Sequence, residues 1–356
     1  MEERERERER ERENFCFLDY CLFVTFFPQL VAGPIVLYEE TVPQFRRAGA
    51  FDADNAALGL YVFVIGLVKK LVIADTIAVF ADNGFSIAAF GYNTSGLQSP
   101  ELGVAAAWVA SLSYTFQIYF DFSGYSDMAV GLARMFNVAL PANFDSPYLS
   151  KSVTEFWRRW HMTLGRALGA DVYVPLGGNR RGHVRTCLNL LLTFLVSGLW
   201  HGASWTFVLW GGLHGACSVL DRLFERHLAK LPGALRVAGT FIVVNLLWVL
   251  FRAESTEVAA KVYRGMFGAA GVNFRQLREV GFDGIINFPL PLCAANIALW
   301  LGVCFAVVFL RPNSNEMARN FSPAGKGKSS AVLTAFLFLL AVICMSRTSP
   351  FIYFNF

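Results

Sequence analysis

The sequence of 356 residues has few charged side chains, which make up 16% of it, against about 25% in ordinary soluble domains. Its mean hydropathy is +0.43, and 55% of its residues are hydrophobic. The apolar residues cluster in long runs, which indicates that lipid, not water, surrounds much of the chain. These features exclude an ordinary soluble domain and predict a membrane protein.

Motifs of several common enzyme classes are absent as well. The sequence has no HExxH, no EF-hand loop and no cysteine–histidine cluster, so we expect no metal site. It has no GxSxG elbow of a serine hydrolase, no P-loop, and no GxGxxG that opens a helix after a strand. The seven cysteines form no CxxC pair, and we interpret them as small hydrophobic residues. We therefore expect no bound cofactor.

The charge pattern argues against nucleic acid and sets the first residues apart. The net charge is only +4, and no basic face is interleaved with aromatic residues. Residues 1–14 are mostly alternating Glu and Arg, which predicts a disordered segment or a solvated helix with ion pairs. We interpret this run as a mis-started reading frame with membrane helices lost upstream, and residues 15–356 as a single membrane domain.

Several apolar runs are long enough to cross a bilayer, whose core of about 30 Å requires about 20 helical residues. The candidate spans are 15–37, 57–80, 103–122, 187–203, 205–220, 236–251, 292–310 and 331–346. As one helix, residues 187–220 would extend about 51 Å, which is too long for one crossing. Gly202 predicts a break within this run, because glycine weakens helices. The sequence thus predicts an all-α protein that crosses the membrane several times.

The basic residues indicate an orientation. Lys and Arg are concentrated in 140–186 and 311–330, whereas 81–102 contains neither. The positive-inside rule places the first two segments in the cytoplasm and the third outside. The same scheme places 221–235 inside and 252–291 outside, although the latter contains several basic residues.

Two of the five histidines stand in unusual surroundings. His201 lies between Trp200 and Gly202 inside an apolar stretch, where a titratable group is costly and usually functional. Imidazole titrates near neutral pH and suits proton transfer. His161 closes the aromatic and basic segment 155–161, which is too polar to cross lipid and is expected to be interfacial or re-entrant. For both histidines, a catalytic and a structural role remain open at this point.

Other polar residues interrupt the apolar runs. Lys69 and Lys70 break the span 57–80, which indicates either snorkelling or a polar cavity. Asp121 and Asp127 follow an apolar span and need partners, for which the two lysines are candidates. These aspartates would either hold helices together or line a site.

A basic segment with a glycine turn offers a place for an anion. Gly177 and Gly178 precede Arg180 and Arg181, a combination that suits phosphate but also fits a plain cytoplasmic turn. An anionic ligand could be received by the basic residues Arg158, Arg159, Arg180 and Arg181.

Ordered motifs run from about residue 26 to the end of the chain: Pro28–Ile35, Tyr119–Asp127, Asn143–Tyr148, Phe156–Leu164, Pro175–Asn179, Leu199–Ala203 and Ser349–Phe354. Together they resemble the membrane-bound O-acyltransferase superfamily, most of all its alginate O-acetyltransferase and D-alanyl transfer branch. The resemblance implies a multi-helix bundle with re-entrant or interfacial helices around a central funnel. It implies that His201 is catalytic and that His161 is a second polar residue of the same site. Leu37 and Gly165 depart from the pattern, where Arg and Ser are common.

The resemblance suggests a mechanism. We expect a neutral His201, favoured by apolar burial, to accept the proton of an acceptor hydroxyl as it attacks the acyl carbonyl. His161 would orient the donor or polarise its carbonyl. Asp121, Trp200 and Trp205 are expected to form the wall of the site. The donor substrate would be acetyl-CoA or an acyl carrier thioester, and we expect Arg158, Arg159, Arg180 and Arg181 to bind it.

The expected acceptor is an exported, alginate-like polysaccharide or a partner protein. Expected partners also include membrane lipid and a periplasmic or extracellular acyltransferase, and the expected location is the inner membrane of a bacterial cell. A transporter of a polar solute is the main alternative, because broken helices and intramembrane charges occur there too. The absence of an inverted repeat argues against it. An inactive truncated scaffold is a further alternative.

Overall fold

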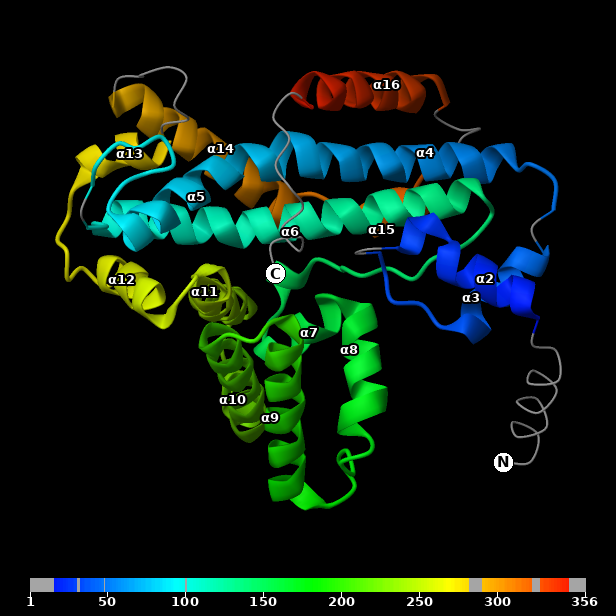
Figure 1. The fold of residues 1–356 in the computed structure, drawn as a ribbon, viewed down its shortest axis with the longest axis horizontal. Coiled ribbons are helices and arrows are strands. Elements are labelled where there is room, and N and C mark those ends of the chain that lie inside the picture. Colours follow the sequence, from blue (N-terminus) through cyan, green and yellow to red (C-terminus); the bar gives the residue numbers. More distant parts are fainter. Residues whose placement is uncertain are drawn as a thin grey trace.

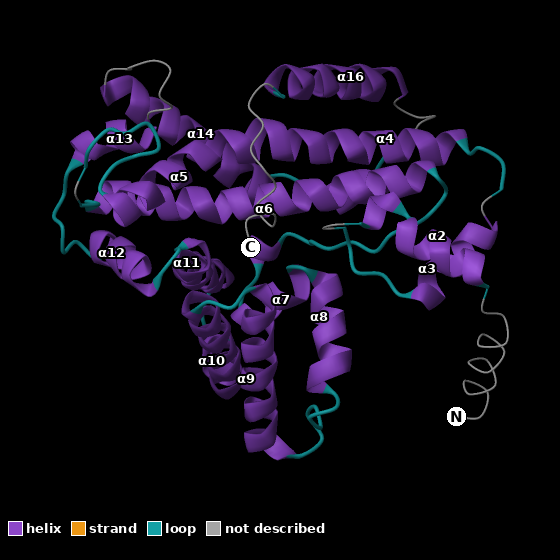
Figure 2. Ribbon diagram, in the orientation of Figure 1, coloured by secondary structure: helices purple, strands orange, loops and turns teal. Residues whose placement is uncertain are grey.

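The computed structural model describes residues 16–30, 33–47, 49–99, 101–281, 290–321 and 327–345. Residues 1–14 and the motif Ser349–Phe354 lie outside these ranges. The described residues form helices and contain no β-strand, apart from one isolated bridge between Tyr92 and Gln98 (Figure 2). The predicted all-α class is confirmed.

The longest helices lie side by side (Figure 1). Helix α4 (Ala53–Val68), the π-helical segment η2 (Lys69–Ala74) and α5 (Asp75–Phe90) form one continuous helix of 38 residues. The antiparallel helix α6 (Val104–Met135) packs along it. A Cβ added to Gly66 would lie 2.5 Å from the carbonyl oxygen of Gly124. Small residues let helix backbones approach this closely, which suits packing in lipid.

A second group of helices lies across the first in Figure 1. Short helices α7 (Val153–Arg159) and α8 (Met162–Leu168) and the π-helical turn η4 (Gly169–Tyr173) lead to the hairpin of α9 (Gly182–His201) and α10 (Trp205–Leu228). Helix α11 (Gly233–Arg252) packs against α10 and α6. The remaining elements are α2 (Phe17–Thr25), η1 (Phe27–Gln29), α3 (Tyr38–Arg47), η3 (Pro147–Leu149), α12 (Thr256–Met266), η5 (Phe274–Gln276), α13 (Leu277–Gly281), α14 (Leu290–Leu310), α15 (Ser314–Arg319) and α16 (Gly327–Cys344).

The predicted break at Gly202 is confirmed. Helix α9 ends at His201 and α10 begins at Trp205, with Ser204 accepting a hydrogen bond from Thr206 N as the N-cap of α10. Close packing at Gly198 holds the hairpin together, because a Cβ there would lie 2.4 Å from the carbonyl oxygen of Phe207. The break therefore leaves His201 at the end of a helix, beside the start of the next.

Four helical segments are long and apolar enough to cross a membrane: Ala53–Phe90, Gly182–His201, Gly233–Arg252 and Leu292–Leu310, with Ser330–Cys344 as a shorter apolar helix. The chain is therefore a multi-pass membrane protein, as predicted. The predicted spans 103–122 and 205–220 are the first parts of the longer helices α6 and α10.

The prediction of one span over 15–37 is wrong. Helix α2 ends at Thr25, and the short turn η1 with Pro28 follows it. Proline lacks the amide hydrogen that a helix needs and clashes with the carbonyl four residues earlier, so it ends the helix.

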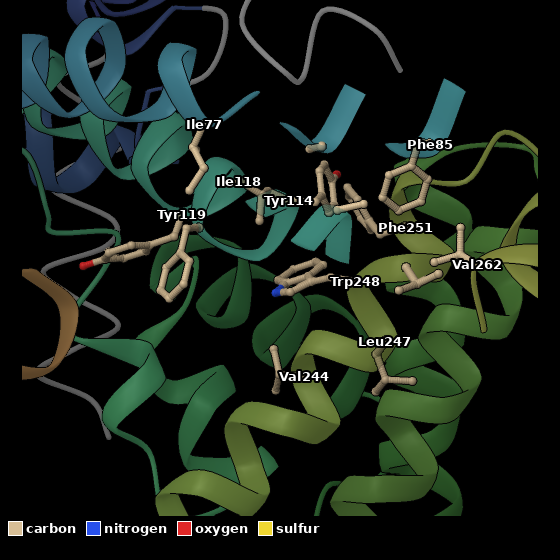
Figure 3. Packing of buried hydrophobic residues seen from close by; sticks show 14 of the residues in the cluster. Ile77, Phe85, Tyr114, Ile118, Tyr119, Val244, Leu247, Trp248, Phe251 and Val262 are labelled. Atoms are coloured by element: carbon tan, nitrogen blue, oxygen red, sulfur yellow. The ribbon is translucent and has the colours of Figure 1, made fainter. Parts of the chain in front are cut away.

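The core is aromatic where the two groups of helices meet. Trp248 and Phe251 of α11 lie near Tyr114 of α6 (Figure 3), and all three side chains are buried. Trp248 Nε1 donates to the hydroxyl of Tyr148, which donates in turn to the carbonyl oxygen of Thr115. Buried aromatic residues with polar tips need such partners. Phe251 of this junction also packs against His201, with ring centroids 5.1 Å apart.

Candidate active site around His161 and His201

His201 lies among aromatic side chains. It is the last residue of α9, and its side chain is buried. Ring centroids of Trp200, Phe251 and Trp210 lie 4.9, 5.1 and 5.2 Å from its own. Trp200 is thus a neighbour of the imidazole, whereas Trp205, also expected in the wall, is 76% exposed at the start of α10.

His161 occupies the turn between α7 and α8. Its φ of 45° is left-handed, a region in which side chains other than glycine are uncommon. The ring is buried and packs edge-on against Phe122 of α6 at 4.7 Å. Its Nδ1 lies 3.3 Å from Oδ1 of Asn143. An unusual backbone held by several contacts is typical of functional sites.

The two imidazoles share one electrostatic environment. Burial is the main cause that lowers the pKa of His161 to about 3, and the nearby His201 contributes to this shift. Desolvation disfavours the charged form of a histidine, so His161 is neutral at pH 7. The structure therefore brings together the two histidines that the sequence analysis selected.

A cavity of about 680 Å³ lies between α7, α8, η4, α9 and α10, with His161 in its wall. Trp157, Leu164 and Phe194 form part of its apolar lining. His201 and Asp121 are not among its lining residues. Its size is that of a pocket for a small organic ligand, and His161 is the catalytic candidate that borders it.

Three arginines line this cavity, and two of them have no acidic partner among the described residues. Arg166 binds both carboxylate oxygens of Glu40, at 2.7 and 2.9 Å. Arg158 and Arg222 line the cavity without an ion pair in the described ranges. The cavity therefore carries unneutralised positive charge, which suits an anionic group.

The other arginines expected to bind a donor lie elsewhere. Arg159 pairs with Glu155 at 2.8 Å and donates to the carbonyl oxygen of Asp145. Arg180 and Arg181 are exposed before α9 and do not line the cavity. Arg222 has no sequence signal that links it to Arg158, because only the packing of α10 against α7 brings both into the cavity wall.

Of the lysines that interrupt the predicted span 57–80, Lys69 is buried and the Lys70 side chain is only 12% exposed, so snorkelling does not explain them. Lys69 Nζ lies 2.6 Å from Asp127 Oδ2 and 3.1 Å from Ser314 Oγ. Lys70 Nζ pairs with Asp75 at 2.8 Å and with Asp121 at 2.5 Å. The predicted pairing of the aspartates with these lysines is confirmed, and it ties η2 to α6. Within the described ranges, no group of three or more His, Cys, Asp or Glu is arranged to hold a metal ion.

The sequence motifs implied a multi-helix membrane protein, and comparison with known proteins gives its class. The model of the membrane-bound O-acyltransferase (MBOAT) family matches residues 2–256. The chain belongs to this family, as its motifs predicted, and a transporter is not favoured.

Individual relatives fall in the same branch. The chain is 42% identical over 355 residues to a peptidoglycan O-acetyltransferase of Helicobacter pylori, a match that covers 96% of the chain and 64% of the relative. It is 37% identical over 350 residues to a protein of Pseudomonas putida named Probable alginate O-acetylase AlgI (95% and 69%). It is 25% identical over 241 residues to a teichoic acid D-alanyltransferase of Bacillus subtilis (64% and 58%). The chain thus spans about two thirds of the length of the first two relatives.

Proposed function

We propose that this protein is a membrane-bound O-acetyltransferase, which moves an acetyl group from a thioester to hydroxyls of an exported polysaccharide. Family membership and the names of the relatives support the reaction class. The observation that carries the proposal is the cavity beside His161, which combines apolar walls with Arg158 and Arg222. A transferase needs such a place for its donor.

The cavity suits a donor with a charged end and a less polar arm. Acetyl-CoA and an acyl carrier thioester both have phosphate next to a pantetheine arm that ends in the acylated sulfur. Arg158 and Arg222 would hold the phosphate, because guanidinium groups bind phosphate oxygens with paired hydrogen bonds. Trp157 and Phe194 would cover the arm. The thioester would then lie toward His161.

In the proposed reaction, His201 is the general base. The acceptor hydroxyl attacks the carbonyl carbon, the carbon–sulfur bond breaks, and an acetyl ester and a thiol form. His201 accepts the hydroxyl proton and returns it to the sulfur, so no proton is gained or lost overall. A positioned base contributes about 10²–10⁴ to the rate. Because His201 does not line the cavity, the acetyl group has to reach past His161.

The proposed setting is the inner membrane of a bacterium, with the basic loops in the cytoplasm. The donor would enter from that side, and the acceptor would meet the site from the other. A periplasmic or extracellular acyltransferase that completes the transfer stays a prediction.

The test uses membranes that contain the protein, acetyl-CoA labelled in its acetyl group, and peptidoglycan or alginate. We expect base-labile label on the glycan, and none with His201→Ala, although this variant reaches the membrane in normal amount. His183→Ala is the matched control, because His183 is an exposed histidine at the start of the same helix. Normal transfer by His201→Ala would refute the assignment of the base. Solute uptake without acylation would refute the transferase.

A further inference from the structure

Asn143 is the centre of a buried hydrogen-bond network beside His161. The side chain is only 2% exposed. Its Oδ1 lies 2.8 Å from Thr163 Oγ1, 3.3 Å from Thr163 N and 3.3 Å from His161 Nδ1. Its Nδ2 donates to Ser126 Oγ at 3.4 Å, and its backbone carbonyl accepts from Met162 N at 3.0 Å. The network joins α6 to the turn that carries His161.

The neighbours of Asn143 decide which way its amide points. Oxygen and nitrogen of an amide have nearly the same shape, so their assignment rests on their hydrogen-bond partners. Thr163 N can only donate a hydrogen bond, and therefore it faces the oxygen. Thr163 Oγ1 accepts from Ile35 N at 3.0 Å, which leaves its own hydrogen for the same oxygen.

The orientation of the amide fixes the proton on His161. Oδ1 has lone pairs and no hydrogen, so the imidazole nitrogen that faces it has to be the N–H. A neutral imidazole carries one such hydrogen, and Nε2 is therefore a bare acceptor. Nε2 has no hydrogen-bond partner among the described residues, and the ring borders the cavity. Asn143 does not line the cavity, so the Nδ1 edge is the protein side of the ring.

We propose that Asn143 is a positioning residue, which holds His161 as the Nδ1–H tautomer and presents an acceptor to the cavity. This inference rests on the proposed function and deepens it. A bare Nε2 cannot polarise an acyl carbonyl, because it has no hydrogen to donate. His161 instead orients the donor by accepting a hydrogen bond at Nε2, for which the amide N–H groups of a pantetheine arm are the matching chemistry.

His214 supplies an opposite case in the same molecule. Trp157 Nε1 is always a donor, and it lies 3.1 Å from His214 Nδ1. The neutral His214 ring therefore carries its hydrogen on Nε2, and its side chain is fully buried. The two histidines should differ in tautomer, so His214 is an internal reference for His161.

The test reads the tautomers directly by nitrogen NMR of the protein labelled with ¹⁵N-histidine in lipid bilayers, with each signal assigned by a single histidine substitution. We expect protonated Nδ1 in His161 and protonated Nε2 in His214. Asn143→Leu should remove the preference in His161 and leave His214 unchanged. Protonated Nε2 in wild-type His161, or an unchanged His161 spectrum in Asn143→Leu, would overturn the proposal. This readout needs no turnover, so it stands apart from a failure of the transferase assay.

The enzymatic activity of the conservative variant Asn143→Asp provides a second readout. Asn143→Asp keeps an acceptor and the tautomer, but its negative charge favours protonated His161. The other titratable groups around the ring are His201 and the arginines Arg158, Arg166 and Arg222. We expect kcat of Asn143→Asp to fall as pH drops from about 7 to 5, with no such fall in the wild type.

Asn143→Leu should lower kcat about tenfold or more at every pH. The upper bound is a loss of about 10⁴, the size of the effect when a catalytic histidine is held in the wrong tautomer. A role limited to folding would not create the acid limb in Asn143→Asp. If Asn143→Leu fails to fold, Asn143→Asp carries the test alone. An Asn143→Asp profile identical to that of the wild type would overturn the proposal.

Discussion

Lys69 and Asp127 form an ion pair between the middle of a 38-residue helix and α6, with Nζ and Oδ2 2.6 Å apart. Both side chains are nearly buried, at 11% and 12% exposure. Ser314 of α15 bridges them, since its hydroxyl donates to Asp127 Oδ1 and lies 3.1 Å from Lys69 Nζ. The ion pair therefore connects η2, α6 and α15.

Removing only one partner of this ion pair should destabilise the protein more than replacing both partners with apolar residues. Lys69→Met leaves a buried carboxylate without its cation, which we expect to destabilise the protein by about 3–5 kcal/mol. The double variant Lys69→Met/Asp127→Leu should recover most of this loss. Unfolding of the purified protein in detergent, followed by heat or denaturant, measures the difference.

The exposed pair of Arg46 and Asp19 is the control. Its arginine side chain is 48% exposed, and surface ion pairs of this kind contribute little to stability because water screens them. Arg46→Met should therefore change stability little. A double variant at positions 69 and 127 that is less stable than Lys69→Met alone would contradict the expected order.

The ion pairs show what could be read from the sequence. Buried charges in apolar runs need partners, and the lysines and aspartates were the candidates. The break at Gly202 was likewise predictable, because a run of that length exceeds one crossing. The cost of an unpaired buried charge predicts the ion pairs, and the length of one bilayer crossing predicts the helix break.

Other features depend on packing that no local rule contains. Arg222 joins Arg158 only through the contact of α10 with α7. Asn143 was part of a recognised motif, but its hydrogen bonds to His161 and Thr163 need the left-handed turn at His161. Hydropathy alone predicts one span over 15–37, but α2 ends at Thr25 and Pro28 lies in the turn that follows.

Acid should destabilise the protein partly through His161. Its pKa is near 3 in the folded state and about 6.5 when exposed. The unfolded chain therefore binds more protons between these values, so this contribution to stability is present above pH 6.5 and is lost as pH falls toward 3. In His161→Gln, the loss of stability on acidification should be smaller than in the wild type. Melting temperatures from pH 7 to pH 4 measure it, and equal slopes for both proteins would contradict the assignment.

Arg158 and Arg222, which have no ion pair among the described residues, should govern affinity for the donor. Removing Arg158 or Arg222 takes away charge-assisted hydrogen bonds to a phosphate, each worth about 1.5–3 kcal/mol, which corresponds to a KM for acetyl-CoA raised about 10- to 150-fold. The rate at saturating donor should change little, because neither guanidinium acts on the acetyl carbon in the proposed reaction. Arg180→Ala is the control, since Arg180 is exposed and lies outside the cavity lining. Initial rates at varied acetyl-CoA and fixed glycan separate KM from kcat. If Arg180→Ala raises KM and Arg158→Ala does not, the donor binds at the glycine turn before α9, and the cavity beside His161 serves another ligand.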